Sequence, residues 1–351
     1  MIPKTAKATL GRGLLDAFRA AGAVEVAPDI LLGADTLLDL YGEDIRARAY
    51  VTTDPVRGEV VLRPDFTVPV VQMHMAGGAD PARYCYLGEV FRKQDQGDTR
   101  PDKPRDNEYF QAGFELFSRE PGADAELFVL FHRVLQPFGL NPVMGDMRLL
   151  LDAVQGLPVS DARRAALAHH VWRPGRFQRL LDRFSEPATP RQFGPPESPW
   201  SGLRGRDEMA ARIARMQADA EEPPLPTEWR DRLTALFGVA GPLPAAVATL
   251  QQMAVDIPSI TDAVSALAAR LDAIADAGVD PEGVRFDASH GRHTMEYYDG
   301  MTFSFYAPGR DDWPAVASGG RYDALTAMLG QGRAIPAVGG IIRPGLLAEM
   351  V

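Results

Sequence analysis

The stretch RYCYLGEVFRKQ at residues 83–94, followed after a polar segment by YFQAGFELF at residues 109–117, decides the fold. Both runs are rich in aromatic and β-branched residues, which favour strands. The segment between them, residues 95–107, is polar and typical of a loop. Two strands joined in this way form a hairpin, which we predict to be antiparallel.

The two faces of the second strand differ in chemistry, because successive side chains of a strand point to opposite faces. One face carries Phe110, Ala112, Phe114 and Leu116, and the other carries Gln111, Gly113 and Glu115. A glycine between an amide and a carboxylate leaves room above the sheet for a small polar ligand with amino or imidazole donors. A solvated outer face is the alternative. Arg92 and Gln94 share one face of the first strand, and this favours a binding floor.

Three zones with different patterns of helix and strand signals follow one another along the chain. Residues 1–150 alternate helical and strand patterns, with an amphipathic helix over 123–135, and form the first part of a sheet domain. Residues 151–280 are mainly helical, and Thr261 is the expected N-cap of their last helix. Residues 281–351 return to strands and complete the sheet domain. The simplest organisation is therefore a sheet domain that a helical insertion interrupts.

Composition excludes several classes of protein. The 351 residues are 46% hydrophobic and 24% charged, which predicts a globular chain of two or three packed domains. With 47 acidic and 37 basic residues, the net charge of −10 argues against attraction to nucleic acid over the whole surface. Cys85 is the only cysteine, so disulfide frameworks and cysteine-rich metal sites are excluded. Without a signal pattern or a run of eighteen apolar residues, we expect a cytoplasmic protein that contacts no membrane.

Five segments, taken in order along the chain, resemble motifs of class II aminoacyl-tRNA synthetases, and specifically of histidyl-tRNA synthetase. They are LRPDFT (62–67), GEVFR (88–92), QAGFELF (111–117), EYYDG (296–300) and GGRYD (319–323). The resemblance implies an α+β fold, in which an antiparallel sheet is flanked by helices and carries a helical insertion. It also implies that the helix before Pro28 takes part in a dimer interface. The anticodon-binding domain of that family is not expected in this chain.

The resemblance also implies a histidine-like pocket and assigns side chains to it. Asp65, Thr67 and Gln111 would hold the α-ammonium group of the ligand. Asp65 stands where the family has a glutamate and is one methylene shorter, so its contact would be shifted or mediated by water. Glu115 and Tyr298 would contact the imidazole.

Three further positions carry alternatives. Arg92 would pair with a carboxylate or with another anion. Tyr297 and Tyr298 are neighbours, so in a strand they would point to opposite faces, and one of them would pack in the core or on the sheet. Arg321 would contact the ligand directly or form a salt bridge that orients the preceding glycine turn, and Asp323 is expected to be structural.

Departures from the synthetase pattern fall at the ATP-binding positions. Gln94 stands where a glutamate reads adenine, and His293 stands where an arginine acts in adenylate formation, although Arg292 is adjacent. Arg343 comes too early for the arginine of motif 3, and Pro344 would disrupt the helix that this motif requires. Binding of ATP in the synthetase manner is therefore not expected.

A synthetase-like core that keeps the histidine-facing residues and loses the ATP arginines resembles the regulatory subunits of ATP phosphoribosyltransferase. That resemblance implies a non-catalytic partner of the short-form catalytic subunit, needed for activity and for histidine feedback inhibition in the first step of histidine biosynthesis. It implies a self-dimer within a hetero-oligomer, histidine as ligand, and no cofactor, metal or nucleic acid. Two alternatives stay open: a short histidyl-tRNA synthetase or other histidine-activating, adenylate-forming enzyme, and a histidine sensor that acts on another protein.

Overall fold

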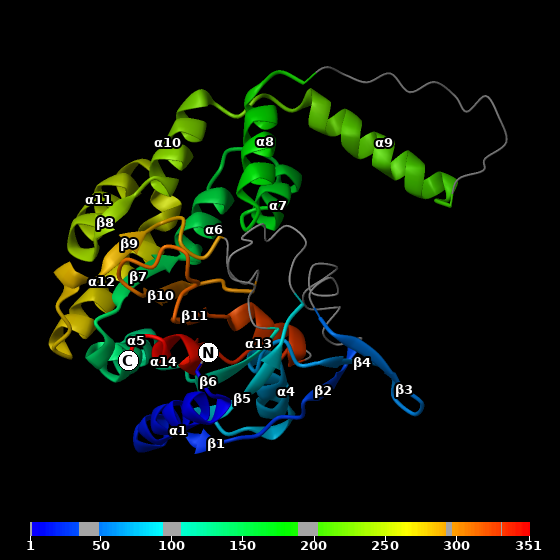
Figure 1. Cartoon of the computed structure of the whole chain (residues 1–351). Coiled ribbons are helices and arrows are strands. Elements are labelled where there is room, and N and C mark those ends of the chain that lie inside the picture. The colour runs from blue at the N-terminus through cyan, green and yellow to red at the C-terminus, as the bar shows by residue number, and fades with distance from the viewer. Residues whose placement is uncertain (1, 35–48, 94–106, 189–202, 293–296, 331) are drawn as a thin grey trace.

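The strands form two sheets in the computed structural model, which describes residues 2–34, 49–93, 107–188, 203–292, 297–330 and 332–351. The large sheet has nine strands in the order β1-β5-β6-β12-β11-β10-β7-β9-β8, and the small one has three in the order β2-β4-β3 (Figure 1). The strands are β1 (Val24–Glu25), β2 (Leu31–Gly33), β3 (Val51–Asp54), β4 (Gly58–Leu62), β5 (Ala82–Phe91), β6 (Glu108–Phe117), β7 (Asn141–Asp146), β8 (Ala240–Pro242), β9 (Arg285–Asp287), β10 (Met301–Tyr306), β11 (Ala317–Arg321) and β12 (Ala337–Ile342).

Helices lie on both faces of the large sheet and in the segment between β7 and β9. The α-helices are α1 (Lys4–Ala20), α4 (Thr67–Gly77), α5 (Ala123–Leu135), α6 (Met147–Gln155), α7 (Asp161–His169), α8 (Pro174–Ser185), α9 (Arg206–Glu221), α10 (Thr227–Phe237), α11 (Leu243–Asp256), α12 (Thr261–Asp276), α13 (Asp323–Leu329) and α14 (Pro344–Ala348). Short 3-10 helices span Gln136–Phe138, Pro258–Ile260 and Pro281–Gly283. Within the described ranges, no helix combines the length and apolar composition needed to cross a bilayer.

The hairpin predicted from the opening stretch is confirmed. β5 and β6 pair antiparallel from Ala82 opposite Phe117 to Phe91 opposite Glu108. β6 then pairs antiparallel with β12, β12 with β11, and β11 with β10. Antiparallel pairing sets residues of one face in rows across the strands, so Glu115 of β6 lies in a row with glycines of β12 and β11.

The apolar face of this sheet packs against α1 and α5. Phe18 of α1 meets the ring of Phe114 edge-on at 5.6 Å between centroids and stacks on Phe131 of α5 at 5.5 Å. Phe131 lies 5.3 Å from Phe303 of β10. All four rings are buried, and each contributes roughly 1.5–3 kcal/mol of apolar burial. The amphipathic helix predicted over 123–135 is confirmed as α5.

The helical segment differs in detail from the sequence interpretation. Figure 1 shows α8 and α9 projecting away from the large sheet. β8 lies inside this segment and extends the large sheet by pairing with β9. Thr261 does not cap α12: it is the first residue of the helix, and its hydroxyl donates to Pro258 O at 2.8 Å. α12 packs against α5, so this helix contributes to the core beside the sheet.

The proline expected to disrupt the last helix begins it instead. Pro344 occupies the first position of α14, where the backbone N–H has no intrahelical partner and the fixed φ of proline suits the helix. α14 packs against α1, and both ends of the chain lie near it (Figure 1). The helix has only 5 residues and ends at Ala348.

Candidate functional site

Glu115 projects from the polar face of β6 and is fully buried. Its Oε1 accepts hydrogen bonds from the hydroxyl of Thr67 at 2.9 Å and of Tyr86 at 2.8 Å, and its Oε2 accepts one from the hydroxyl of Tyr322. Thr67 is the first residue of α4, Tyr86 lies in β5, and Tyr322 directly precedes α13. One carboxylate therefore joins four elements of the fold. The alternative prediction, that this face of the strand is exposed to solvent, is therefore wrong.

Burial dominates the ionisation of this carboxylate. It raises the pKa of Glu115 to about 7, against the three hydroxyl hydrogen bonds, which lower it, and with the charge of Asp65, which raises it. Among the described residues, Glu115 forms no ion pair with a lysine or arginine, and none of the largest influences on its pKa comes from a cation. A buried carboxylate that only hydroxyl groups solvate is complementary to a cationic ligand, which would supply the missing positive charge.

Asp65 and two tyrosines lie around Glu115. Asp65 is buried, and its charge also acts on both Tyr297 and Tyr298. Tyr297 hydrogen-bonds to Thr67 and to Tyr298. Residues 297–300 form a turn and coil, so the strand alternation assumed for these neighbours does not apply, but the Tyr298 ring does pack on the sheet, over Gly320. We name the resulting group the Glu115 cluster: Asp65, Thr67, Tyr86, Glu115, Tyr297, Tyr298 and Tyr322.

Glycines provide the space that these side chains occupy on the sheet. A Cβ atom on Gly339 would lie 1.5 Å from Glu115 Oε2, and one on Gly113 would lie 2.2 Å from the ring of Tyr86. A Cβ atom on Gly320 would lie 2.7 Å from the ring of Tyr298. The cluster therefore lies flat against bare backbone, and a side chain at any of these three glycines would displace one of its members.

Gln111 and Arg92 lie toward the other end of the hairpin. Gln111 is buried on the same face of β6 as Glu115, opposite Gly88, and its Oε1 has no hydrogen-bond partner among the described residues. Leaving a buried amide oxygen unpaired costs roughly 1–3 kcal/mol, so a ligand with a donor would be favoured there. Arg92 Nε donates to the carbonyl of Pro64 at 2.8 Å, directly beside Asp65. Arg92 thus borders the segment that carries Asp65 and Thr67, and Gln111 lies opposite Gly88, which Phe66 of that segment covers.

Arg321 is not brought to the Glu115 cluster. It pairs with Val338, which pairs with Leu116, and this register places it on the apolar face of the sheet. Its guanidinium forms ion pairs with Asp124 at 2.6 Å and with Asp323 at 3.1 Å. The salt-bridge alternative therefore describes the contacts of Arg321 in this structure.

Of the positions that depart from the synthetase pattern, Gln94 and His293 lie outside the described residues. Arg292 is directed into the helical segment: its Nε donates to Val171 O at 2.8 Å, and its guanidinium lies 4.6 Å from the ring centroid of Phe237. The register shift that would have brought Arg292 to the position of an adenylate-forming arginine is not seen.

Sequence reasoning missed two of the three hydroxyl donors. Tyr86 has the same strand parity as Arg92 and lies opposite Gly113, so period two could have placed it on the polar face. Its ring also stacks on Phe66 at 4.3 Å. Tyr322 follows the last residue of β11, and its contact with Glu115 spans more than 200 residues of sequence. No local pattern identifies that contact.

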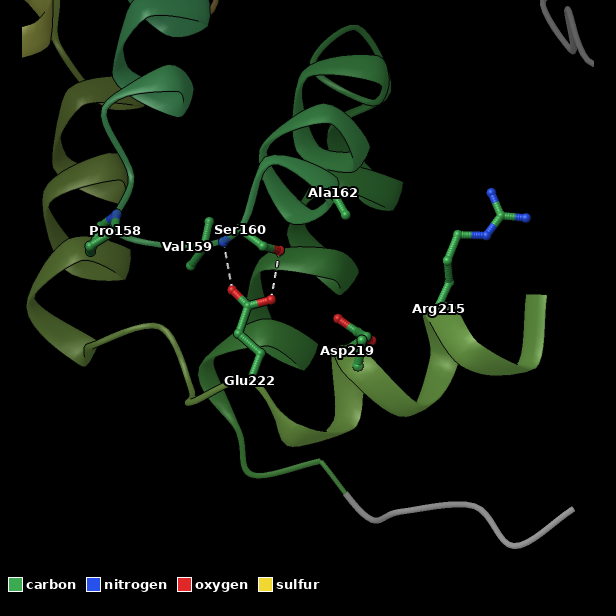
Figure 2. Close-up of a pocket in the computed structure, with 8 residues that line it drawn as sticks. Pro158, Val159, Ser160, Ala162, Arg215, Asp219 and Glu222 are labelled. Atoms are coloured by element: carbon green, nitrogen blue, oxygen red, sulfur yellow. Dashed lines mark hydrogen bonds between the residues drawn. The ribbon is translucent and has the colours of Figure 1, made fainter. Parts of the chain in front are cut away.

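A separate pocket of about 550 Å³ lies between α7 and α9 (Figure 2). Glu222 lines it and accepts hydrogen bonds from the N–H and the hydroxyl of Ser160, both at 2.6 Å. Arg163 is buried beside it and binds Asp219 at 2.8 Å and the carbonyl of Pro223 at 2.9 Å. These bonds fasten the C-terminal end of α9 to the start of α7. The pocket is thus a junction between helices, and it lies apart from the described site residues that the sequence predicted.

Antiparallel pairing around β5 and β6, with a polar face that carries Glu115 and an apolar face packed against α1 and α5, defines a class II aminoacyl-tRNA synthetase-like core. A family model described as histidyl-tRNA synthetase matches residues 3–180 and 206–344. An ATP phosphoribosyltransferase regulatory subunit of Agrobacterium fabrum is 32% identical over 93% of this chain and 92% of its own length. One of Sinorhizobium fredii is 31% identical over 93% and 92%. The chain therefore belongs to the ATP phosphoribosyltransferase regulatory subunits of the histidyl-tRNA synthetase family.

Solved structures agree on the fold. A Bacillus halodurans protein described as an ATP phosphoribosyltransferase regulatory subunit/histidyl-tRNA synthetase superposes with a TM-score of 0.71 at 20% identity, covering 99% of this chain and 80% of that one. Histidyl-tRNA synthetase from Nostoc sp. PCC 7120 gives a TM-score of 0.68 at 15% identity, covering 99% and 73%. The predicted class II fold is confirmed.

Proposed function

We propose that this chain is the non-catalytic subunit that activates a short-form ATP phosphoribosyltransferase and makes it sensitive to histidine. Membership of the regulatory-subunit family supports the regulatory role. The proposed partner is the short-form catalytic subunit, which carries out the first step of histidine biosynthesis, and the complex would work in the cytoplasm with that enzyme.

One observation carries the proposal that histidine is the ligand. Glu115 is a fully buried carboxylate with three hydroxyl donors, a second acid nearby and no described cationic partner. A carboxylate oxygen pair has about four lone-pair directions, and three are used here. An imidazole N–H or an ammonium group would take the remaining capacity and offset the buried charge.

Different residues contact different groups of the ligand in this proposal. Asp65, Thr67 and Gln111 hold the α-ammonium, with the unpaired Gln111 Oε1 as one acceptor. Glu115 and Tyr298 contact the imidazole. The other members of the Glu115 cluster orient these groups through their hydrogen bonds, so Tyr297 acts through Thr67 and Tyr298.

Arg92 supplies positive charge for the ligand carboxylate in this proposal. Its Nε bond to Pro64 O fixes the guanidinium next to the segment that holds Asp65. Arg321 stays outside the proposed contacts, because its guanidinium is engaged by Asp124 and Asp323.

The proposal includes a self-dimer within the hetero-oligomer, formed through α1 and β1. β1 is an edge strand of the large sheet, and its Val24 is 62% exposed. An exposed apolar residue on an open edge favours pairing with another chain. Light scattering of the purified chain should give the mass of a dimer, and Val24→Lys should weaken it.

Calorimetric titration tests the ligand and the partner together. The purified chain is titrated with histidine and separately with ATP, and phosphoribosyl transfer is measured with the catalytic subunit alone and after mixing. Histidine binding without ATP binding, and activity that appears on mixing and falls as histidine is added, supports the proposal. ATP binding with histidine-dependent pyrophosphate exchange would overturn it in favour of a histidine-activating enzyme.

Restored activity that histidine does not inhibit would separate the two parts of the proposal. In that case the chain activates its partner, but the Glu115 cluster does not serve feedback inhibition. Histidine binding with no effect on the catalytic subunit would instead favour a sensor that acts on another protein.

A further inference from the structure

Asp299 joins two parts of the Glu115 cluster that are distant in the sequence. It directly follows Tyr298, and its carboxylate accepts two backbone N–H groups of α13, that of Asp323 at 3.0 Å and that of the next residue at 2.6 Å. Asp323 directly follows Tyr322, whose hydroxyl donates to Glu115. One side chain therefore holds the turn that carries Tyr298 against the backbone that carries Tyr322.

The backbone around Asp299 is fixed on both sides. Its N–H, which belongs to the peptide bond after Tyr298, donates to the carbonyl of Arg321 at 3.1 Å. The carbonyl of Gly300 accepts the N–H of Met147, the first residue of α6, at 2.9 Å. The turn that follows Tyr298 is thus bonded to the end of β11 and to the start of a helix on the other side.

Close packing on β11 leaves this turn little room to move. A Cβ atom on Gly320 would lie 2.7 Å from the ring of Tyr298. A Cβ atom on Gly300 would lie 2.8 Å from Cδ of Arg321, the residue that follows Gly320. The Tyr298 ring and the backbone of Gly300 therefore lie against consecutive residues of one strand.

The start of α13 gives the carboxylate of Asp299 a fixed partner. Tyr322, which precedes the helix, makes no side-chain cap, and its N–H donates to the carbonyl of Ala337 at 2.9 Å. Asp299 therefore satisfies the first N–H groups of α13 in place of a local cap. Burial raises the pKa of Asp299 to about 6, so the carboxylate is mainly ionised at neutral pH, where both of its oxygens accept.

We propose that Asp299 is a positioning residue for ligand recognition, which holds Tyr298 in the arrangement in which Tyr298 and Glu115 contact one imidazole. The inference rests on the proposed function, since it needs Tyr298 to contact the ligand. Asp299 itself contacts no ligand atom and acts through Tyr298. Its contribution is orientation, so most of it should disappear when the Tyr298 hydroxyl is removed.

A double-mutant cycle on the full-length chain tests this coupling. Histidine affinity is measured by calorimetry for the wild type, Asp299→Ala, Tyr298→Phe and the double variant. We expect Asp299→Ala to weaken binding about tenfold in the wild-type background, the equivalent of one or two hydrogen bonds, and less than about threefold in the Tyr298→Phe background. A residue that only stabilised the fold would weaken binding equally in both backgrounds.

A conservative variant protects the test against misfolding. Asp299→Asn keeps one oxygen that accepts an N–H group of α13, so binding should weaken only about threefold. If Asp299→Ala does not fold, Asp299→Asn replaces it in the cycle, and its loss should fall below about 1.5-fold in the Tyr298→Phe background. Circular dichroism and the melting temperature report folding for each variant.

Asp54→Ala is the matched control. Asp54 also accepts two backbone N–H groups, those of Val56 and Arg57, both at 2.8 Å. It lies at the turn of the β3–β4 hairpin in the small sheet, away from the Glu115 cluster (Figure 1). Asp54→Ala therefore removes the same kind of contact and should leave the histidine affinity unchanged.

The outcomes separate the inference from the proposed function. A wild-type chain that does not bind histidine would sink the proposed function. If the wild type binds, an affinity that Asp299→Ala leaves within twofold would overturn the inference alone. An equal loss in both backgrounds would also overturn it, because the effect would then not pass through Tyr298. Undiminished affinity in Tyr298→Phe would do the same, because the contact that Asp299 positions would not exist.

Discussion

Replacing Glu115 by glutamine should weaken histidine binding and at the same time stabilise the fold above neutral pH. The pKa of Glu115 is raised from 4.5 to about 7 by burial, so the folded state binds a proton more tightly than the unfolded chain. A carboxyl group with a raised pKa lowers stability as the pH rises, because the native state must ionise it at a cost. The loss begins near pH 4.5 and is complete somewhat above pH 7.

The size of this effect follows from the difference in pKa. Each pKa unit corresponds to 1.36 kcal/mol, so the difference between 4.5 and about 7 amounts to roughly 3 kcal/mol of stability above pH 7. Of this, about 2.5 kcal/mol is lost between pH 5 and pH 8. Glu115→Gln removes the ionisation, so the variant should be more stable than the wild type at pH 8 and nearly equal at pH 5.

Urea unfolding at the two pH values and calorimetry with histidine are the assays. Taking the difference between variant and wild type at each pH cancels the other titrating groups. Histidine affinity should fall at least about tenfold, because the ligand loses its charged acceptor. Glu108→Gln is the matched control on the same strand: Glu108 is exposed and bonded to Lys4, so its loss should change stability by less than about 0.5 kcal/mol. A glutamine variant that is less stable than the wild type at pH 8, or that binds histidine normally, would refute the reasoning.

Three other substitutions give separate tests. Gly339→Ala places a Cβ atom 1.5 Å from Glu115 Oε2 and should therefore eliminate calorimetric histidine binding, and undiminished affinity would count against the cluster as the site. Tyr322→Phe removes a hydrogen bond that lowers the pKa of Glu115, so the fall in urea stability should still begin near pH 4.5 but continue to a higher pH than in the wild type, and a fall that ends at the wild-type pH would contradict this assignment. Arg270→Met leaves the buried Asp124 and Asp146 without their shared partner, so urea unfolding should show that the free energy of unfolding falls by about 3–5 kcal/mol. A fall of less than about 1 kcal/mol would mean that these ion pairs do not stabilise the fold.

Local periodicity predicted the parts of the fold that depend on neighbours in sequence. The parity of β6 places Glu115 and Gln111 on one face, and the helical spacing of residues 123–135 identifies α5. The resemblance to a known family supplied the order of the motifs along the chain. Neither the periodicity nor the resemblance predicts on which face of the sheet a motif residue lies when it is at the end of a strand. Arg321 and Tyr322 are adjacent, yet Arg321 binds Asp124 on one face and Tyr322 binds Glu115 on the other.

Irregular backbone and buried charge account for the other differences. Tyr297 and Tyr298 follow no strand, so alternation could not place them. Arg270 lies in a helix whose sequence predicts a surface position for a charged residue, but it is buried by ion pairs with Asp124 at 2.8 Å and Asp146 at 3.0 Å. Those partners lie more than 100 residues away, and no pattern in the sequence of α12 indicates them.

The polar face of this sheet, which carries the Glu115 cluster, depends on positions that have no side chain. Glycines of four strands lie beneath the groups that cover the face, so each ring or carboxylate rests on bare backbone: Gly113 under Tyr86, Gly339 under Glu115, Gly320 under Tyr298 and Gly145 under His290. These glycines are up to 226 residues apart in the sequence and become neighbours only through the register of β6, β12, β11, β10 and β7. The same rows of backbone set the positions of four side chains: Tyr86, Glu115, Tyr298 and His290. If one strand shifted in register, the glycine of that strand would no longer lie under the side chain that covers it. The strand register, which the core on the opposite face maintains, is therefore what keeps the Glu115 cluster in order.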